Sequence, residues 1–291
     1  MSETTKIEWC DTTVNPIMGC EGCELRSAHV KSCYAGSLHD RYARTNPGFA
    51  PSFEQVTKFP GRMMTVAKLK NLQATERMLK PWLNGLQRLI FVSDMGDALS
   101  SSIDFPYLEQ QIVDVVRSTA GRRHKWLWLT KRPERMATFS NYLKAKGISW
   151  PEHLCAGTSI TTQSTVSRID ALGKVGNSET VRFLSVEPQL NAVELKGKLT
   201  TISWVIQGGE SGPKARPFDL NWAESVRDTC RNANVPYFLK QLGSNPVVSG
   251  IPLKLKSHHG NDWNEWPVAL RVRETPFERE LDIFERLEVL S

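Results

Sequence analysis

Short apolar runs alternate with longer amphipathic stretches along most of the chain. The runs are rich in β-branched and aromatic residues, and polar residues follow each of them. In order they are Lys6–Cys10, Arg88–Asp94, Lys125–Thr130, His153–Ser159, Val181–Pro188, Ser203–Gly209 and Pro236–Gln241. Near-continuous apolar runs of this length are typical of strands that are buried on both faces, as in a parallel sheet.

The stretches between the runs predict helices that cover such a sheet. Apolar positions recur with helical spacing in Tyr107–Ala120, Arg132–Lys146 and Leu220–Ala233. Asp219 precedes the last of these and is a suitable N-cap. Strand–helix alternation repeated about seven times predicts an α/β fold with a parallel sheet, either closed as a (β/α) barrel or open and doubly wound.

The chain divides into a main body and two additions. We expect a (β/α) domain over residues 1–243, with an insertion at about 46–86 that is rich in turns and basic residues. Residues 244–291 are expected to form a C-terminal extension. The 291 residues are enough for one large α/β domain.

Polar residues collect where the predicted strands end. The segments are Ser93–Asp97, Thr130–Pro133, Gly157–Thr162, Ser185–Pro188, Gly208–Gly212 and Lys240–Gly243. Any one of them can simply end a strand and begin a turn. In parallel α/β folds, however, the functional site lies at the carboxyl ends of the strands. Six such ends in succession predict a ring of acids, bases and hydroxyls around one mouth, which favours an enzyme.

Some of these residues have the chemistry to bind a ligand. Gly208 and Gly209 would let a ligand approach the backbone, and Glu210 can accept from an ammonium group or a ribose hydroxyl. The alternative is a tight turn with a surface glutamate. Asp94 and Asp97 can hold a cationic or hydroxylated ligand, or cap the helix that follows.

Other strand-end residues have the chemistry to act on a substrate. Glu187 stands where a carboxylate would point into the mouth. Lys131, Arg132 and Lys240 can bind a carboxylate or phosphate, although long basic side chains are commonly solvated. Either lysine can also act as a Schiff-base amine in a lyase.

Three of the six cysteines lie within 14 residues, with the spacing C-x2-C-x9-C: Cys20, Cys23 and Cys33. Three thiolates on a four-iron, four-sulfur cluster leave one iron open to a cofactor. A zinc site needs a fourth ligand, for which Cys10, His29 and His39 are near in sequence. The segment follows the first predicted strand and therefore lies over the mouth, which favours the cluster.

The remaining cysteines and two tryptophans are expected in the interior. Cys10 is interpreted as a buried thiol, with a spare ligand or a hydrogen donor as alternatives. Cys155 and Cys230, within a predicted strand and a predicted helix, are expected in the core. Trp126 and Trp128 alternate with apolar neighbours and are also expected there.

Charge and composition narrow the classes of partner only slightly. Lys and Arg exceed Asp and Glu by 37 to 31, and the isoelectric point is near 9.0, which permits nucleic-acid binding. The insertion contributes the basic stretch Lys58–Lys70. No apolar run is long enough to span a membrane, and the N-terminal residues lack the layout of a secretory signal, so we expect a cytoplasmic protein without a membrane partner.

Several motifs resemble those of the three-cysteine-motif phage protein family, which occurs in bacteriophages and prophages and is similar to radical S-adenosylmethionine (SAM) enzymes. They are "IEWCDTTVNPIMGC", "CYAG", "IFVSDMGD", "LWLTKRPERM", "VRFLSVEPQL" and the block from Trp204 to Gly243. The resemblance spans roughly residues 6–243. It implies a partial or full TIM-like barrel of the radical-SAM type, with a cluster on Cys20, Cys23 and Cys33.

The same resemblance implies how the site is used. The amino and carboxylate groups of SAM chelate the open iron, and reduction by an external electron donor gives a 5′-deoxyadenosyl radical that abstracts hydrogen from a substrate. The residues expected near SAM are Asp94, Asp97, Thr130, Thr158, Ser159, Gly208, Gly209 and Glu210. Those expected to act on the substrate are Glu187, Lys131 and Lys240.

The phage context implies a nucleic-acid or nucleotide substrate. Modification or rearrangement of a base, as in thymidine hypermodification of phage DNA, suits this chemistry, and the reaction class would be isomerase, lyase or transferase. The compartment would be the cytoplasm of a bacterial or phage-infected cell. The alternative from another class is a zinc-stapled nucleic-acid-binding protein without radical chemistry.

Overall fold

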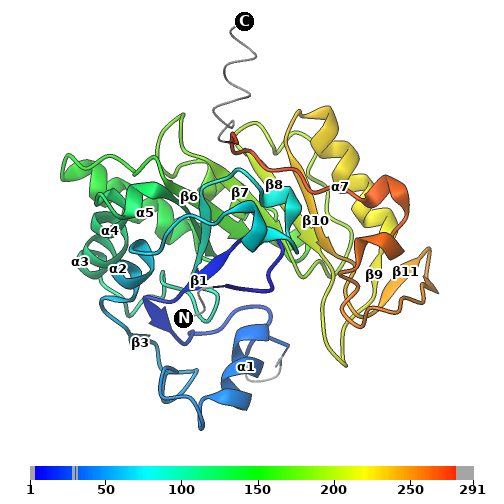
Figure 1. The fold of residues 1–291 in the computed structure, drawn as a ribbon, viewed down its shortest axis with the longest axis horizontal. Helices are drawn as coiled ribbons and strands as arrows, with labels where there is room; N and C mark the ends of the chain where they lie inside the picture. The colour runs from blue at the N-terminus through cyan, green and yellow to red at the C-terminus, as the bar shows by residue number, and fades with distance from the viewer. Residues whose placement is uncertain (1–3, 28–29, 31, 280–291) are drawn as a thin grey trace, which may run out of the picture.

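Seven parallel strands form the central sheet of the computed structural model, which describes residues 4–27, 30 and 32–279. In spatial order they are β1 (Thr12–Val14), β4 (Arg88–Val92), β5 (His124–Thr130), β6 (Leu154–Ser159), β7 (Arg182–Val186), β8 (Trp204–Gly208) and β10 (Tyr237–Gln241). The sheet curls into a half-barrel with β1 and β10 at its edges (Figure 1). The predicted α/β fold is confirmed at this level: a mixed α/β chain with a partial, TIM-like parallel sheet.

Six of the seven predicted strands coincide with strands of the sheet to within about two residues, but the first prediction is wrong. Residues 6–10 form turns, and β1 begins at Thr12. Trp9 and Cys10 are nevertheless fully buried. The run is apolar because Trp9 and Cys10 pack against the inner face of the sheet. The pattern of apolar residues alone does not distinguish a short buried turn from a short buried strand.

The outer side of the half-barrel is covered by α2 (Arg62–Ala67), α3 (Phe105–Leu108), α4 (Asp114–Arg117), α5 (Pro133–Ala145), α6 (Arg168–Leu172) and α7 (Leu220–Asn232) (Figure 1). The helix α1 (Tyr34–Tyr42) lies apart from the sheet, in a small apolar cluster of its own. The predicted α5 and α7 are confirmed, and the side chain of Asp219 caps α7 by accepting from the Asn221 backbone N–H at 3.0 Å. A π-helical turn, η3 (Glu109–Val113), interrupts the stretch that was predicted as one helix.

The remaining short elements belong to the insertion, the loops and the C-terminal extension. Short strands are β2 (Ile17–Met18), β3 (Thr57–Lys58), β9 (Phe218–Asp219), β11 (Pro246–Val248) and β12 (Ile251–Pro252). The 3₁₀ turns are η1 (Ala74–Arg77), η2 (Pro81–Leu83), η4 (Gly121–Arg123), η5 (Gln163–Thr165), η6 (Trp263–Glu265) and η7 (Val268–Leu270). β3 of the insertion pairs with β2, and β11 of the extension pairs with β9, so both additions are tied to the main body.

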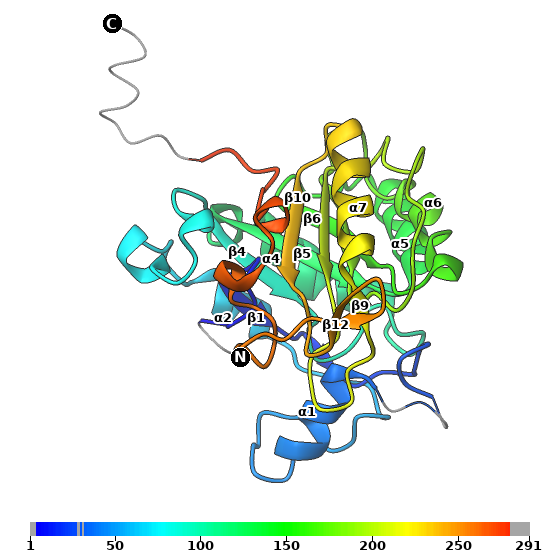
Figure 2. The ribbon, with the colours of Figure 1, turned by 90° about the vertical axis from the view of Figure 1, so that its right-hand side faces the viewer.

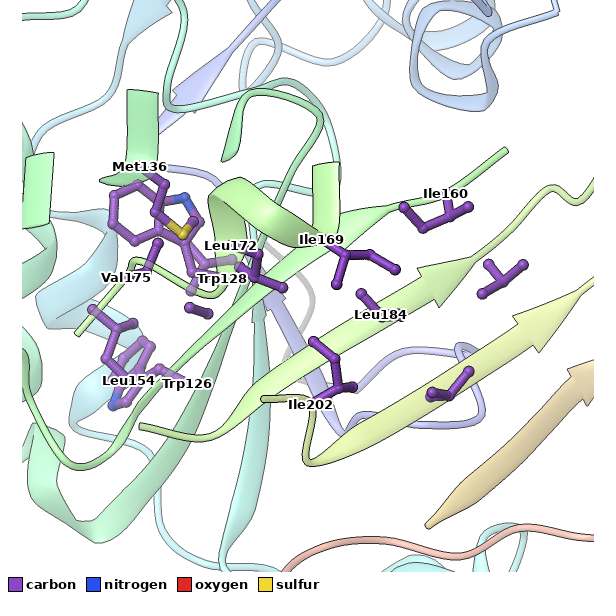
Figure 3. Packing of buried hydrophobic residues seen from close by; sticks show 14 of the residues in the cluster. Trp126, Trp128, Met136, Leu154, Ile160, Ile169, Leu172, Val175, Leu184 and Ile202 are labelled. Carbon is purple, nitrogen blue, oxygen red and sulfur yellow. The ribbon is translucent and has the colours of Figure 1, made fainter. Parts of the chain in front are cut away.

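The outer face of the sheet and its helices share the largest core. Figure 3 shows Trp128 of β5 beside Met136 of α5, and Trp126 of the same strand beside Leu154 of β6. Both tryptophans are fully buried there, which confirms their assignment to the core. Cys230 of α7 belongs to the same cluster, as predicted. Because helices bury the outer face of the strands and a second cluster buries their inner face, the sequences of these strands are almost continuously apolar.

The inner face of the sheet forms a separate aromatic cluster at the floor of the half-barrel. Successive strands contribute inward side chains at every second position, since neighbouring residues on a strand point to opposite faces. The cluster comprises Trp9, Cys10, Leu83, Leu86, Leu89, Phe91, Leu127, Cys155, Phe183, Trp204, Ile206 and Phe238. Cys155 and Cys10 are therefore interior thiols, as predicted. This floor closes one end of the half-barrel and leaves the carboxyl ends of the strands as its mouth.

Gly157 of β6 makes room for the ring of Phe183 on the neighbouring strand. A Cβ atom added at Gly157 would lie 2.2 Å from the Phe183 Cζ atom. We expect Gly157→Ala to lower the free energy of unfolding by about 1–3 kcal/mol, since the ring is held by other aromatic side chains and cannot retreat freely. Chemical denaturation measures this. The double variant with Phe183→Leu should recover part of the loss, and an unchanged single variant would contradict the packing.

The C-terminal extension covers the free edge of β10 (Figure 2). The Leu239 N–H donates to the Val272 carbonyl at 2.9 Å, and Phe238 forms a bridge with Arg273. The Arg273 guanidinium lies 4.0 Å from the ring centroid of Trp82, which belongs to the insertion. An exposed edge strand invites unwanted pairing. Insertion and extension meet here and cover that edge.

Candidate metal and cofactor site at the barrel mouth

The described residues between Gly19 and Cys33 are here called the cysteine loop, and they are tied to the carboxyl ends of several strands. Its first anchor is Glu21, which lies between Cys20 and Cys23. The Glu21 carboxylate accepts from the Ser101 and Ser102 backbone N–H groups at 2.9 and 3.1 Å and from the Ser101 hydroxyl at 2.8 Å. These serines follow β4, so the loop is held over the end of that strand.

The second anchor is Glu24, on the other side of Cys23. Its carboxylate accepts from both terminal nitrogens of Arg168 at 2.9 Å and from the Thr161 hydroxyl at 2.9 Å. Thr161 and Arg168 follow β6. A third contact joins Ser32, next to Cys33, to Arg216 in the loop after β8, at 3.2 Å. The cysteine loop therefore lies across the mouth, where its position after the first strand predicts it.

Both anchoring carboxylates stay ionised well below neutral pH. Burial disfavours the charge of Glu21, but hydrogen bonds from Ser101 and Ser102 and the charge of Arg132 outweigh it and lower its pKa to about 2. Burial likewise opposes the charge of Glu24, and the hydrogen bonds and charge of Arg168 outweigh it, which also lowers that pKa to about 2. In the unfolded chain these two carboxylates take up a proton near pH 4.5, whereas in the folded chain they do so only near pH 2.

The anchors should add stability that disappears in acid. A lowered folded-state pKa stabilises the fold above the unfolded value, and the contribution fades as the pH falls from about 4.5 towards 2. At pH 7 we expect the double variant Glu21→Gln/Glu24→Gln to be less stable than the natural chain by on the order of 1–2 kcal/mol. Denaturation at a series of pH values should show this difference shrinking below pH 4.5, whereas the exposed Glu179→Gln should show none.

The three sulfurs of the cysteine loop all accept hydrogen bonds from backbone N–H groups. The donors are Gly22 for Cys20, Leu25 for Cys23 at 3.4 Å and Gly36 for Cys33 at 3.5 Å. The last contact also makes Cys33 the N-cap of α1. Such contacts stabilise a thiolate, and hydrogen bonds to cysteine sulfur are among the features that tune iron–sulfur centres. Burial nevertheless raises the pKa of the Cys20 thiol, and its hydrogen bond from Gly22 offsets only part of that effect.

The described residues do not yet bring the sulfurs together. Within residues 4–27, 30 and 32–279, no three Cys, His, Asp or Glu side chains are grouped closely enough to hold a metal ion. Cys20 and Cys33 do pack against the same small apolar cluster beside α1. As the described residues are arranged, the three sulfurs therefore do not form a metal site.

The side chains considered as a fourth zinc ligand are engaged elsewhere or lie outside the described residues. Cys10 lies at the aromatic floor, and burial raises the pKa of its thiol. The His39 Nε2 atom lies 2.7 Å from the Ala50 carbonyl oxygen within the packing around α1. His29 lies outside the described residues. Neither Cys10 nor His39 is therefore placed to complete a metal site with the cysteine loop.

Asp94 is a carboxylate at the mouth whose described donors are neutral. The Asn15 side-chain amide donates to it at 2.6 Å, and Thr13 hydrogen-bonds to it as well. Burial raises the pKa of Asp94, and these hydrogen bonds offset only part of the effect. Ser93 beside it has a left-handed backbone (φ 73°), and its buried hydroxyl has no hydrogen-bond partner among the described residues. Together they offer acceptors and a donor to a ligand.

Glu187 and Lys240 form an ion pair across the mouth, with Gly208 of the strand between them. The Lys240 ammonium donates to Glu187, and the Gln241 amide donates to the same carboxylate at 3.2 Å. Burial disfavours the Lys240 charge, but Glu187 outweighs it and raises the pKa of the lysine. A Cβ at Gly208 would lie 3.4 Å from the Glu187 carboxyl carbon, which is ordinary van der Waals contact, so the carboxylate packs directly against this glycine.

Tyr34, directly after Cys33, links the cysteine loop to this ring. Burial raises the pKa of its phenol, and Asp94 and Glu187 raise it further while Lys240 lowers it. Asp94 follows β4, Glu187 follows β7, and Lys240 belongs to β10. The Tyr34 side chain is 60% exposed, which leaves a face of the ring open.

Other predicted site residues are engaged within the protein. Asp97 accepts from the Thr130 hydroxyl at 2.8 Å and from the Lys131 backbone N–H at 3.0 Å. Thr158 donates to the Thr130 carbonyl at 2.9 Å. Asp97, Thr130 and Thr158 thus brace the loop after β5, and Ser159 is buried at the end of β6, where its carbonyl accepts from Arg168.

The Gly-Gly-Glu segment after β8 is also used for internal contacts. A Cβ at Gly209 would lie 2.5 Å from the Leu242 carbonyl oxygen, so this glycine allows two loops to pack. Glu210 accepts from the Arg216 side chain at 2.7 and 2.8 Å and from its backbone N–H at 3.0 Å. The open space that was expected for a ligand backbone contact is filled here by protein.

Sequence reasoning missed the residues that position the others. Glu21 and Glu24 each follow a cysteine in "CEGCEL". This pairing of carboxylates with cysteines was the sequence feature that could have indicated the two anchoring residues. Asn15, which orients Asp94, and Tyr34 had no comparable signal, because their partners are far away in sequence.

A shallow cavity of about 430 Å³ lies elsewhere, beside α3. Its lysines are already paired, Lys58 with Asp104 and Lys146 with Glu109, both at 2.6 Å.

Among the helices of the described residues, none is long and apolar enough to cross a membrane.

Comparison with known proteins places the chain in a family. Residues 4–282 match the family model described as "Protein of unknown function (DUF5131)", and the chain belongs to that family. No curated protein and no solved structure matches the chain significantly.

Proposed function

We propose that the protein is a radical SAM enzyme whose cluster is held by Cys20, Cys23 and Cys33. The observation that carries the proposal is the placement of three sulfurs, each with a backbone N–H donor, on a loop that Glu21 and Glu24 anchor across the mouth of a parallel half-barrel. A loop of this kind beside a ring of polar strand ends suits a cofactor that is activated at the carboxyl ends of the strands.

When bound and reduced, a four-iron, four-sulfur cluster of this kind supplies reductive cleavage of SAM to a 5′-deoxyadenosyl radical. The chain's own residues would bind and orient SAM. Asp94, held by Asn15, would accept from the SAM amine or a ribose hydroxyl, and the free Ser93 hydroxyl would donate. The aromatic floor below them excludes water from the radical's surroundings.

The opposite side of the mouth would meet the substrate. Glu187 and Lys240 are fixed by each other and by Gln241, so each is oriented towards the mouth. We propose a nucleic acid or nucleotide as substrate, with base modification or rearrangement as the reaction and an external one-electron donor. The net charge of +6 supports a polyanionic partner through phosphate contacts.

Anaerobic reconstitution with iron and sulfide, followed by SAM and dithionite, tests the proposal. We expect a brown protein that releases 5′-deoxyadenosine, and DNA or nucleosides added to the assay should then show a mass change. A colourless protein with stoichiometric zinc and no 5′-deoxyadenosine would instead establish the zinc-stapled nucleic-acid-binding protein.

Glu187→Gln should lower substrate turnover by roughly 10²-fold or more, since the change removes the charge that orients Lys240. Iron content should stay that of the natural chain, because Glu187 lies outside the cysteine loop. Glu179→Gln is the matched control: it is exposed and precedes the amino end of the same strand. Equal turnover in both variants would remove Glu187 from the site.

A further inference from the structure

Lys240 lies at an irregularity in β10, the edge strand of the sheet. Leu239 pairs with Gln207 of β8, and the next paired residue, Gln241, lies opposite Gly208. Lys240 is therefore an extra residue in its strand, which is the arrangement of a β-bulge. Bulges bend a strand locally and redirect its side chains, and they are common beside active sites.

The bulge lets two consecutive residues reach the same carboxylate. In a regular strand, neighbouring side chains point to opposite faces of the sheet. Here Lys240 and Gln241 both donate to Oε1 of Glu187, the Gln241 amide at 3.2 Å. The side-chain oxygen of Gln241 accepts in turn from the Ser211 hydroxyl at 2.7 Å, which orients the amide. The geometry of the ion pair at the mouth therefore depends on the bulge.

The C-terminal extension holds this bulge through Arg273. The Arg273 Nε atom donates to the Leu239 carbonyl at 3.3 Å, and Nη2 donates to the Lys240 carbonyl at 3.0 Å. The backbone of Arg273 also forms a bridge with Phe238 on the same strand. One guanidinium thus joins the carbonyl of the extra residue to the carbonyl before it, and the planar, two-point contact suits arginine.

Four aromatic rings surround this guanidinium and fix its direction. Its Cζ atom lies 4.0 Å from the ring centroid of Trp82, 5.2 Å from that of Trp266, 5.3 Å from that of Trp263 and 5.6 Å from that of Phe238. Aromatic rings attract a cation placed this close. Trp82 belongs to the insertion, Phe238 to β10 and the other two rings to the extension, so Arg273 is held by three parts of the chain.

We propose that Arg273 is a positioning residue of the mouth: by holding the bulge, it keeps the Lys240 ammonium and the Gln241 amide directed at Glu187. The inference rests on the proposed function for its assignment of Glu187 and Lys240 to the substrate. Without the guanidinium the carbonyls of Leu239 and Lys240 lose a donor, and regular alternation of β10 would leave only one of the two side chains facing Glu187. The extension is then part of the site as well as a cover for the edge of β10.

Acetylation of lysines by acetic anhydride tests this without cofactor or substrate. Only the uncharged amine reacts, and mass spectrometry gives the rate at Lys240 relative to that at the exposed Lys214. In Arg273→Gln we expect Lys240 to react roughly tenfold faster or more, because a buried ammonium that loses its carboxylate gives up its proton more readily. Arg273→Lys keeps a cation among the rings without the planar fork. It should give a rate between the two, and it serves where Arg273→Gln does not fold.

Arg271→Gln is the matched control. Arg271 also belongs to the extension and also donates to two carbonyls, those of Trp266 at 3.1 Å and Asn264 at 2.7 Å, but neither lies on β10. The Lys240 rate in this variant should be that of the natural chain. An equal rise in Arg271→Gln and Arg273→Gln would indicate a general loosening of the extension and would overturn the positioning role.

A double-variant cycle decides whether Arg273 acts through the ion pair. Glu187→Gln alone should raise the Lys240 rate roughly tenfold or more, and adding Arg273→Gln should raise it no further. Effects that multiply, or an unchanged rate in Arg273→Gln, overturn the inference and leave the proposed function standing. A natural chain that releases no 5′-deoxyadenosine after reconstitution overturns the proposed function, whereas the acetylation rates still decide the role of Arg273.

Discussion

Single replacement of Cys20, Cys23 or Cys33 by alanine is expected to abolish stable iron incorporation during anaerobic reconstitution. A four-iron cluster held by three protein thiolates has no spare ligand, so loss of one leaves two and a second open iron. Iron and sulfide per chain, together with the absorbance near about 400 nm, measure the result. The three variants should remain folded, because each sulfur is only partly buried.

Cys10 and Cys230 provide matched controls for this experiment. Both are buried, one at the aromatic floor and one in the outer core, and burial raises the pKa of both thiols. Cys10→Ala and Cys230→Ala should therefore keep most of the iron. Equal loss of iron in Cys10→Ala would indicate coordination by four thiolates, and the open iron on which SAM binding depends would be absent.

The parts of the fold that depend on local pattern were predictable. The apolar runs that became β4 to β8 and β10 are buried on both faces, so burial and strand formation coincide. The Asp219 cap needs only its own neighbours in sequence. The stretch at 107–120 was predicted as one helix, because apolar spacing does not reveal the π-helical turn of η3.

The site was predictable in place but not in detail. Parallel topology alone puts the polar strand ends at one mouth, and the structure brings Asp94, Glu187 and Lys240 there. Which carboxylate stays open to a ligand depends on contacts with distant residues. Glu210 is engaged by Arg216, whereas Asp94 receives its described hydrogen bonds from neutral side chains. No local pattern distinguishes the two.

Gly208 is a second residue whose neighbours could not be predicted from the local sequence. A Gly-Gly pair at a strand end suggests close approach of a ligand to the backbone. In the structure the Glu187 carboxyl group, which pairs with Lys240, packs against Gly208. The neighbour of this glycine is thus a side chain of the chain itself.

The largest effect on stability is expected from the ion pair between Asp11 and Arg77, whose side chains are each only 1% exposed. Arg77 belongs to the insertion, and its guanidinium donates to both oxygens of Asp11 at 3.0 and 2.6 Å. It also donates to the carbonyls of Leu83, Leu86 and Gln87. Asp11 in turn accepts from the Leu89 backbone N–H at 2.8 Å, at the start of β4.

Removing one partner of this pair leaves the other charge buried and uncompensated. We expect Asp11→Asn and Arg77→Met each to lower the free energy of unfolding by about 3–5 kcal/mol, out of the roughly 5–15 kcal/mol that a typical domain possesses. The double variant should lose less than the sum of the two, because no unpaired charge remains. Chemical denaturation of all three gives the coupling energy directly.

The exposed pair of Lys198 and Asp170 supplies the control, with side chains that are 42% and 61% exposed. Asp170→Asn should change the free energy of unfolding by about 0–1 kcal/mol, since water screens a surface pair. If Asp11→Asn were as mild as Asp170→Asn, the insertion would be independent of the half-barrel. Because Arg77 instead binds the carbonyls at 83–87 and the carboxylate before β1, we expect the insertion and the first two strands of the sheet to unfold together.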